Sequence, residues 1–297
     1  MPTSDHELTI VHKAPDSDLI DVLQGAARWE IQVHEHGLVA LVDVMPRLVP
    51  AGKTADSAIV QAARVSYGQG TRQVNEDRGL IRYLARHRHS TPFEMVEFKF
   101  HHVMPIFVGR QWIRHRTANV NEYSARYSVV PDRFYRPSAE NLRKQSTQNR
   151  QGGDTTLDAL TASQFEEYLA LAEARYIDYE RMLGLGVSRE QARIGLPLSV
   201  YTEWYWKCDL HNIFHFLSLR LDQHAQQEIR DYAIAMFALI KPIVPLAAEA
   251  FVDYRLEAIT LTRLEIEAMQ SGQLLASDNS REIAEWDAKQ ARLKRHE

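Results

Sequence analysis

The sequence is poor in cysteine: Cys208 is the only one among 297 residues. A single thiol excludes an internal disulfide framework and any metal site built from several cysteines, and we expect no bound metal. No apolar run approaches ~18 residues, which excludes a membrane-spanning helix. The first residues also lack a basic stretch followed by an apolar one, so we expect no secretory signal and a cytoplasmic protein without a membrane partner.

Positive charge is not in excess either. The chain has 35 basic and 39 acidic side chains and a formal net charge of −4, so we do not expect nucleic acid as a partner. Hydrophobic residues make up 45% and charged residues 25%, which is the composition of an ordinary globular protein. A chain of this length forms one large domain or two small ones, and either can bury a core.

Three common functional motifs are missing. The chain has no GxxxxGK[ST] loop and no GxSxG turn, which excludes a P-loop nucleoside triphosphatase and the usual α/β-hydrolase. Residues 184–189 (GLGVSR) carry two of the three glycines of a dinucleotide-binding loop, but Arg189 replaces the third and no strand is expected before them. We therefore expect no Rossmann domain.

The hydrophobic pattern predicts an α+β fold, a mixed α/β protomer in which helices flank a strand-rich region. Apolar and polar side chains alternate in residues 94–104 (EMVEFKFHHVM), which predicts a half-buried strand, and residues 37–44 predict another. Pro105 ends the first of these strands and can start a helix over 106–116. Further helical segments are expected over 56–70, 75–90, 162–186, 188–196, 202–222 and 224–244.

Strands and helices do not alternate regularly, so we expect a single main domain and no βαβ architecture. We place this domain at residues 37–254, between a polar N-terminal appendage (1–36) and a charged helical C-terminal tail (255–297). Residues 132–158 are rich in Arg, Gln, Ser, Thr and Gly, which predicts a loop.

Arginines are concentrated between Arg110 and Arg126. These 17 residues contain four arginines and one acidic side chain, a local net charge of +3 on a chain that is net negative. Guanidinium groups suit bidentate binding of phosphate or carboxylate, and the Ser, Asn and Ala residues between them let an anion approach the backbone. The segment predicts a pocket for a phosphorylated small molecule. By composition alone, a solvated basic helix end is an equally good interpretation.

A second group of polar residues surrounds Cys208 on one of the expected helices. His211 and His215 are four residues apart and share a face, and Asp209 and Arg220 lie on one stripe if the helix is continuous. The HExxH zinc pattern is absent, so a structural or surface role for the histidines is favoured over metal binding. A cysteine within an apolar helix is expected to be inert.

The arginine-rich segment resembles the signature of the flavin-dependent thymidylate synthases, which is Arg-His-Arg, seven further residues and then Ser. Here RHR occupies 114–116 and the serine is Ser124. Five blocks resemble the same family in the same order: HSTPFE, PIFVGRQWIRHR, NEYSARYS, ARIGLP and LRLDQHAQQEIR. The resemblance extends from about Gly37 to Tyr254.

The resemblance implies an activity as well as a mixed α/β fold. Members of this family methylate deoxyuridine monophosphate (dUMP) at C5 of uracil to give dTMP, with 5,10-methylenetetrahydrofolate as carbon donor. Flavin adenine dinucleotide (FAD), reduced by NADPH, carries the hydride, and tetrahydrofolate is released. The protomers assemble as a homotetramer with flavin sites shared between subunits. The family uses no cysteine nucleophile, which agrees with an inert Cys208.

The resemblance also implies roles for individual residues. Arg220 would lie against the uracil as the catalytic residue and stabilise charge when N3 ionises. His89 would lie at the flavin face where folate or NADPH docks. The nucleotide would contact Gln111, Arg114, Glu122, Ser124, Ala125, Arg126, Arg193 and Arg220. The flavin would contact Ser66, Thr91, Arg114, His115, Arg116, Thr117, Asp209, Leu210, His211 and His215.

Two features depart from the family pattern. Some relatives carry Asn and Arg where this chain has Asp209 and His211, so the charge at these flavin contacts differs. Asn119 stands where a longer form of the signature has serine, and both side chains donate hydrogen bonds. The resemblance does not cover the appendage, residues 137–158 or the tail.

Two other functions stay open at this point. A non-catalytic nucleotide- or RNA-binding protein would use the arginine-rich segment with aromatic stacking platforms at Tyr123, Tyr127, Phe134 and Tyr135. A flavin reductase would bind flavin and NADPH but would be indifferent to dUMP.

Overall fold

The structure is a computed structural model in which residues 18–65, 77–146 and 152–294 are described. It divides into a first unit that ends at Ala250 and a second that covers Phe251–Glu297. None of the helices within the described ranges has the length and apolar character needed to cross a membrane.

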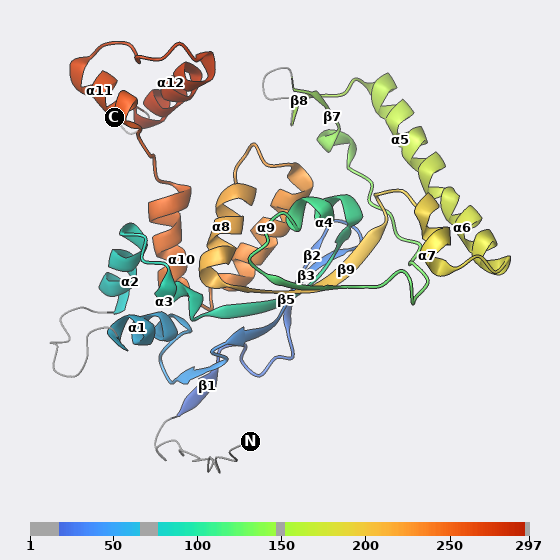
Figure 1. The fold of residues 1–297 in the computed structure, drawn as a ribbon, viewed down its shortest axis with the longest axis horizontal. Coiled ribbons are helices and arrows are strands. Elements are labelled where there is room, and N and C mark those ends of the chain that lie inside the picture. Colours follow the sequence, from blue (N-terminus) through green and yellow to red (C-terminus); the bar gives the residue numbers. More distant parts are fainter. Residues whose placement is uncertain (1–17, 66–76, 147–151, 295–297) are drawn as a thin grey trace, which may run out of the picture. The chain divides into compact units, whose positions relative to one another are not determined.

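A five-stranded antiparallel sheet forms the centre of the first unit (Figure 1). Its strands lie in the order β2-β3-β5-β9-β6. Their bounds are β2 Trp29–Val33, β3 Gly37–Met45, β5 Glu97–Pro105, β9 Tyr201–Asp209 and β6 Asn119–Glu122. The mixed α/β class and the strands expected over 37–44 and 94–104 are confirmed, the latter two as β3 and β5.

One face of this sheet packs against three helices, α4 (Ile106–Trp112), α8 (Leu210–Arg220) and α9 (Gln227–Ile240). The alternation in β5 buries Phe100 on this face, opposite Trp206 of β9. The ring of Trp112 stacks on that of Phe216 in α8, with centroids 4.6 Å apart. Each buried ring of this kind stabilises the fold by about 2–3 kcal/mol.

The helix expected over 202–222 is wrong in its first half, because residues 201–209 form the strand β9. In this strand the buried Trp204, Trp206 and Cys208 alternate with more exposed polar residues, which is the period of a strand and not of a helix. Cys208 is therefore a strand residue. The helix α4 is also shorter than expected and ends before Arg114–Arg116.

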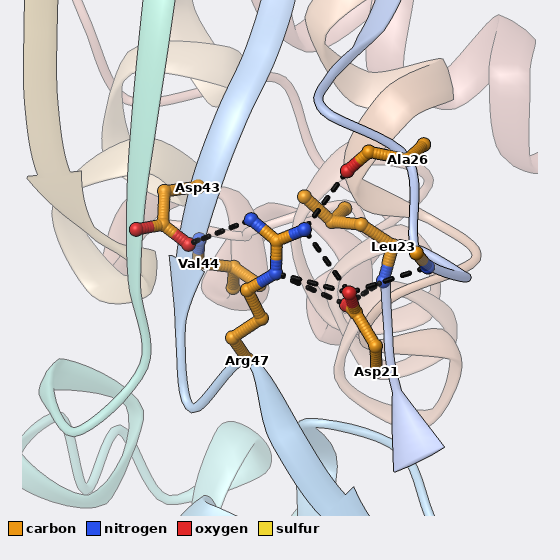
Figure 2. Close-up of polar contacts among 7 residues, drawn as sticks. Asp21, Leu23, Ala26, Asp43, Val44 and Arg47 are labelled. Atoms are coloured by element: carbon orange, nitrogen blue, oxygen red, sulfur yellow. Dashed lines mark hydrogen bonds and ion pairs between the residues drawn. The ribbon is translucent and has the colours of Figure 1, made fainter.

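Part of the segment expected as an N-terminal appendage belongs to the folded unit. Strand β2 is an edge strand of the sheet, and β1 (Leu19–Asp21) pairs with β4 (Leu48–Pro50). Figure 2 shows how Arg47 secures this region: its guanidinium contacts the Asp21 carboxylate at 3.0 Å and the carbonyl oxygen of Ala26 at 2.8 Å. The ion pair lowers the pKa of Asp21.

Four short helices complete one end of the first unit. The segments expected over 56–70 and 75–90 contain α1 (Asp56–Val65) and α2 (Asp77–Arg86), which are followed by α3 (Thr91–Glu94). The buried carboxylate of Asp56 accepts hydrogen bonds from the N–H groups of Leu246 and Ala247 at 2.9 and 3.0 Å, at the start of α10 (Pro245–Phe251). Burial raises the pKa of Asp56.

The loop expected over 132–158 contains a hairpin, which corrects that expectation. The hairpin consists of β7 (Arg143–Gln145) and β8 (Gly153–Thr156), and the short helix η1 (Ala139–Asn141) precedes it. The chain continues through α5 (Ala159–Glu173), α6 (Arg175–Gly184), α7 (Arg189–Ala192) and η2 (Arg193–Gly195). The side chains of Val130, Tyr176, Tyr179, Ala192 and Val200 form a small core beside these helices.

The second unit is helical. It contains the π-helical η3 (Val252–Leu256), α11 (Arg263–Ser271) and α12 (Ser280–Lys294). The two longer helices are joined by Lys289, whose ammonium group donates to the buried Glu265 carboxylate at 2.8 Å. Glu265 also closes a capping box with Thr262 at the start of α11.

Candidate active site

The loop after α4 meets the end of α8 at a hydrogen bond between His115 and Arg220. The Nε of Arg220 donates to Nε2 of His115 at 3.1 Å. The His115 ring also lies edge-on against the rings of His215 and Phe216, at centroid distances of 5.9 and 4.9 Å. Two segments about a hundred residues apart in sequence therefore share one site.

Burial determines the charge state of the His115 imidazole. It lowers the pKa of His115 to about 4, with smaller contributions from Arg220 and His215. At neutral pH the imidazole is therefore uncharged, and its unprotonated Nε2 can accept the hydrogen bond from the arginine. No other hydrogen bond or ion pair of the Arg220 side chain is found among the described residues, so its Nη groups are available to a ligand.

The start of α8 is fixed by Asp209, which the sequence pattern predicted to lie within a helix. Asp209 is the N-cap of α8 and accepts from the backbone N–H and the side-chain Nδ2 of Asn212 at 2.9 and 2.7 Å. The backbone N–H of Leu210 donates to the carbonyl oxygen of Val96 at 2.8 Å. This cap and this tether set the position of Leu210 and His211 relative to the nearby α3, which carries Thr91.

Cys208 links the same region to the arginine-rich segment. Its thiol donates to the carbonyl oxygen of Thr117 at 3.2 Å. Burial, with the nearby Asp209 and Glu97 carboxylates, raises the pKa of the thiol well above its usual range. Because the thiolate is the nucleophilic form, the raised pKa disfavours nucleophilic chemistry at Cys208, and its thiol contacts the backbone at Thr117.

The structure thus gathers most of the residues expected to contact flavin. Thr91, His115, Thr117, Leu210, His211 and His215 come from α3, the loop after α4 and α8. Ser66 lies outside the described residues. Both oxygens of Asp209 are engaged by Asn212, so a flavin contact from Asp209 stays a prediction.

Four of the residues expected to bind the nucleotide lie at the end of β6 and in the turn that follows it: Glu122, Ser124, Ala125 and Arg126. Glu122 accepts a hydrogen bond from the Thr202 hydroxyl at 2.8 Å. In the turn, the N–H groups of Tyr127 and Ser128 donate to the Ser124 carbonyl oxygen at 3.0 and 3.1 Å. Ala125 packs against the small core that includes Ala192.

Arg126 lies beside the helix that precedes Arg193. Its Nε donates to a carboxylate oxygen of Glu190 on α7 at 2.9 Å, and both side chains are about half exposed. Arg193 begins η2 directly after α7 and is exposed. The turn and α7 thus bring two of the arginines expected to contact the nucleotide to neighbouring segments.

Several cations of the site lack a partner. Among the described residues, the exposed guanidinium groups of Arg114, Arg116 and Arg193 form no hydrogen bond or ion pair. The Oε1 of Gln111 is buried, also without a hydrogen-bond partner in the described part of the chain. A buried acceptor and three free cations fit ligands that carry several phosphates and donor groups.

Three residues that contact the site were not predicted from the sequence. Thr202 orients Glu122, Glu190 pairs with Arg126, and Phe216 supports the His115 ring. Phe216 could be expected from the apolar stripe of α8, whereas the pairing of Thr202 and Glu190 depends on how distant segments pack.

One alternative loses part of its support in the structure. Of the four rings considered as platforms for bases, Tyr135 is 7% exposed and Phe134 packs against the small core, whereas Tyr127 is 76% exposed. Within the described ranges, no group of three or more His, Cys, Asp or Glu side chains is arranged to hold a metal ion.

Comparison with known proteins decides the family. The chain is 62% identical over 287 residues to a flavin-dependent thymidylate synthase of Dictyostelium discoideum, which covers 97% of this chain and 95% of the relative. The chain belongs to the flavin-dependent thymidylate synthase family. The model of this family, described as thymidylate synthase complementing protein (Thy1), matches residues 47–246.

Two further relatives support the assignment to the flavin-dependent thymidylate synthases. The enzyme of Gluconobacter oxydans (strain 621H) is 52% identical over 256 residues, covering 84% of this chain and 82% of the relative. Among solved structures, the UMP/dUMP methylase PolB from Streptomyces cacaoi, bound with 5-Br UMP, aligns with a TM-score of 0.66 and 34% identity. That alignment covers 76% of this chain and 98% of PolB.

Proposed function

We propose that this enzyme methylates dUMP to dTMP, with 5,10-methylenetetrahydrofolate as carbon donor and FAD reduced by NADPH as hydride carrier, and releases tetrahydrofolate. The observation that carries the proposal is the His115–Arg220 pair in a family member whose nearby Arg114 and Arg116 form no hydrogen bond or ion pair with the described residues. The curated relatives are named flavin-dependent thymidylate synthases, and the solved relative is named a UMP/dUMP methylase.

The nucleotide phosphate would be held at the turn after β6. Arg126 would exchange its half-exposed contact with Glu190 for the phosphate, which is a better partner for a planar guanidinium. Arg193 would approach from η2, and the backbone N–H groups around Ser124 and Ala125 would add neutral donors. Gln111, Arg114 and Glu122 would contact the rest of the nucleotide.

Arg220 would lie against the uracil as the catalytic residue. Its Nε is fixed by neutral His115, so its free Nη groups would face the base and stabilise negative charge when N3 ionises. Such charge on the ring activates C5 toward an electrophilic carbon. A preoriented cation in a partly buried site stabilises a developing anion more than a mobile one does.

The residues around α8 would hold the flavin, which when bound and reduced would supply the hydride. Arg114 and Arg116 would pair with its phosphates, and Thr91, Thr117 and His211 would add hydrogen bonds. Ser66, His115, Asp209, Leu210 and His215 would complete this site. His89 would lie where folate or NADPH docks.

We also propose a cytoplasmic homotetramer in which each flavin site is shared between subunits. The exposure of Arg114, Arg116 and His215 in the single chain supports this proposal, because a second subunit could cover these residues once the ligands are bound.

The experiment is a reconstitution with omitted components. The purified protein is incubated with FAD, NADPH, methylenetetrahydrofolate and either dUMP or UMP, and the nucleotide is analysed for a gained methyl group. Methylation of dUMP that requires both FAD and NADPH supports the proposal. A flavin-bound protein that oxidises NADPH at the same rate with and without dUMP, and forms no dTMP, would instead be a flavin reductase.

A further inference from the structure

Helix α2 ends in a turn that usually requires glycine. The N–H of Arg88 donates to the carbonyl oxygen of Ala85 at 3.2 Å, and the N–H of His89 donates to that of Leu84 at 2.9 Å. These two bonds define the Schellman motif, whose left-handed residue is most often glycine. Here that residue is Arg88, with φ +59°.

The same turn elsewhere in the chain uses glycine. At the end of α6, the N–H of Gly186 donates to the carbonyl oxygen of Leu183, and that of Val187 donates to the carbonyl oxygen of Met182, both at 3.0 Å. Gly186 has φ +84°. Since two turns with matching hydrogen bonds differ in this one residue, the arginine at position 88 is not required by the backbone and is in fact disfavoured by it.

Arg88 stands in the sequence between His87 and His89, two members of a group of aromatic rings. The ring of Tyr83 lies 4.4 Å from that of His87 and 5.8 Å, edge-on, from that of His89, measured between centroids. All three side chains are exposed, and 41% of Tyr83 is accessible. Exposed aromatic groups of this kind favour stacking with a flat heterocycle.

The charge beside these rings is positive. Arg86 and Arg88 are both exposed, and within the described ranges neither guanidinium has a hydrogen bond or ion pair. Residues held in a disfavoured backbone conformation cluster at active sites and ligand clamps. A ligand with a flat heterocycle and an anionic group matches this surface, because the heterocycle can stack on the rings while the anion pairs with an arginine.

We propose that Arg88 anchors an anionic group of the co-substrate that docks over His89, with Tyr83 and His87 supporting the His89 ring. This inference rests on the proposed function, which places folate or NADPH at His89. Both candidates combine a heterocycle with an anion: folate has a carboxylate tail, and NADPH has a 2′-phosphate that NADH lacks.

The test uses Arg88→Gly, which removes the charge and also suits the left-handed turn. Loss of one charge-assisted contact is expected to raise KM for the anchored co-substrate about ten- to hundredfold with kcat nearly unchanged. The Kd of the same co-substrate, measured by quenching of tryptophan fluorescence, is expected to rise in parallel. Arg88→Lys keeps the charge but not the bidentate geometry of the guanidinium, so it is expected to raise KM less than Arg88→Gly does.

The matched control is Gln24→Gly. Gln24 also has a left-handed backbone, with φ +57°, and is exposed in the segment between β1 and β2. Both glycine variants are expected to have a Tm equal to or above that of the wild type, but only Arg88→Gly is expected to change KM or Kd.

Two comparisons identify the anion. A penalty in Arg88→Gly that is larger for triglutamyl than for monoglutamyl methylenetetrahydrofolate assigns the folate tail, and a penalty for NADPH that is absent with NADH assigns the 2′-phosphate. Unchanged KM and Kd for both co-substrates would overturn the anchor while leaving the proposed function intact. A wild-type protein that methylates no nucleotide would instead contradict the proposed function.

Discussion

The Nε of Arg220 donates a hydrogen bond to Nε2 of His115 at 3.1 Å, and this contact joins the last residue of α8 to the loop after α4. The neutral imidazole orients the guanidinium without neutralising its charge. Arg220 is thereby held as a directed cation, which is what stabilisation of an ionised uracil requires.

Replacement of Arg220 by alanine is expected to remove most methyl transfer while FAD stays bound. Loss of one preoriented charge at the reacting ring should lower kcat about 10²- to 10³-fold. Methyl transfer and the flavin absorbance of the purified variant are the measurements. Arg175→Ala, on an exposed arginine of α6, is the control. Full activity in Arg220→Ala would exclude the proposed role.

The stability of the enzyme should fall as the pH is lowered through the range in which an unfolded histidine titrates. The pKa of His115 is about 4 in the folded protein against an ordinary value of 6.5. Between these values the unfolded chain binds more protons, so the free energy of unfolding decreases as the pH falls from about 6.5 to about 4, and this group contributes no further loss below that.

His115→Gln isolates this contribution, because glutamine can still accept the bond from Arg220 but does not titrate. Urea unfolding of both proteins between pH 7 and pH 4 should show a smaller loss of stability in the variant. Buried His102, whose pKa is also well below its usual value, contributes equally to both proteins. Identical pH profiles would contradict the buried, neutral state of His115.

Cys208→Ala should leave methyl transfer within about twofold of the wild type, because the thiol is buried and its raised pKa disfavours the nucleophilic thiolate. Loss of the bond to Thr117 and of the sulfur volume should lower the free energy of unfolding by about 1–2 kcal/mol. Cys208→Ser, which keeps a donor, is the matched variant. A folded Cys208→Ala protein with no methyl transfer would revive nucleophilic catalysis by this residue.

Arg126 and Glu190 should affect nucleotide binding in opposite directions. Arg126→Ala is expected to raise KM for dUMP about ten- to hundredfold, through loss of a charge-assisted bond to phosphate. Glu190→Gln removes the competing carboxylate and should lower KM by no more than about threefold, since half-exposed ion pairs contribute little. KM and the Kd from equilibrium dialysis measure both effects; an unchanged KM in Arg126→Ala would remove Arg126 from the phosphate site.

The local pattern of the sequence predicted β5 and most helices because their periodicity is uninterrupted. It failed at β9, where the strand ends at Asp209 and α8 begins at the next residue, with no glycine or proline to mark the boundary. The information was present: Trp204 and Trp206 alternate with polar residues, and Asp209 followed three residues later by Asn212 is an N-cap signal. The helix predicted over 202–222 therefore wrongly includes the strand residues that precede this N-cap.

The site could be predicted from sequence only through the family motif. The local +3 charge indicated an anion pocket, but it left a solvated helix end equally plausible. Which residue supports each arginine depends on tertiary packing: His115 meets Arg220 across 105 positions, and Arg126 meets Glu190 across 64. Pairings at that separation follow from the sheet order and have no local signature.

The most direct test of the proposed function is mass spectrometry of the nucleotide after incubation with the wild-type enzyme and its proposed partners. We expect dUMP to gain one methyl group only when FAD, NADPH and methylenetetrahydrofolate are all present, and Arg220→Ala to abolish most of this gain. A folded, flavin-bound protein that leaves dUMP unmodified, or methylation that continues without flavin, would contradict it.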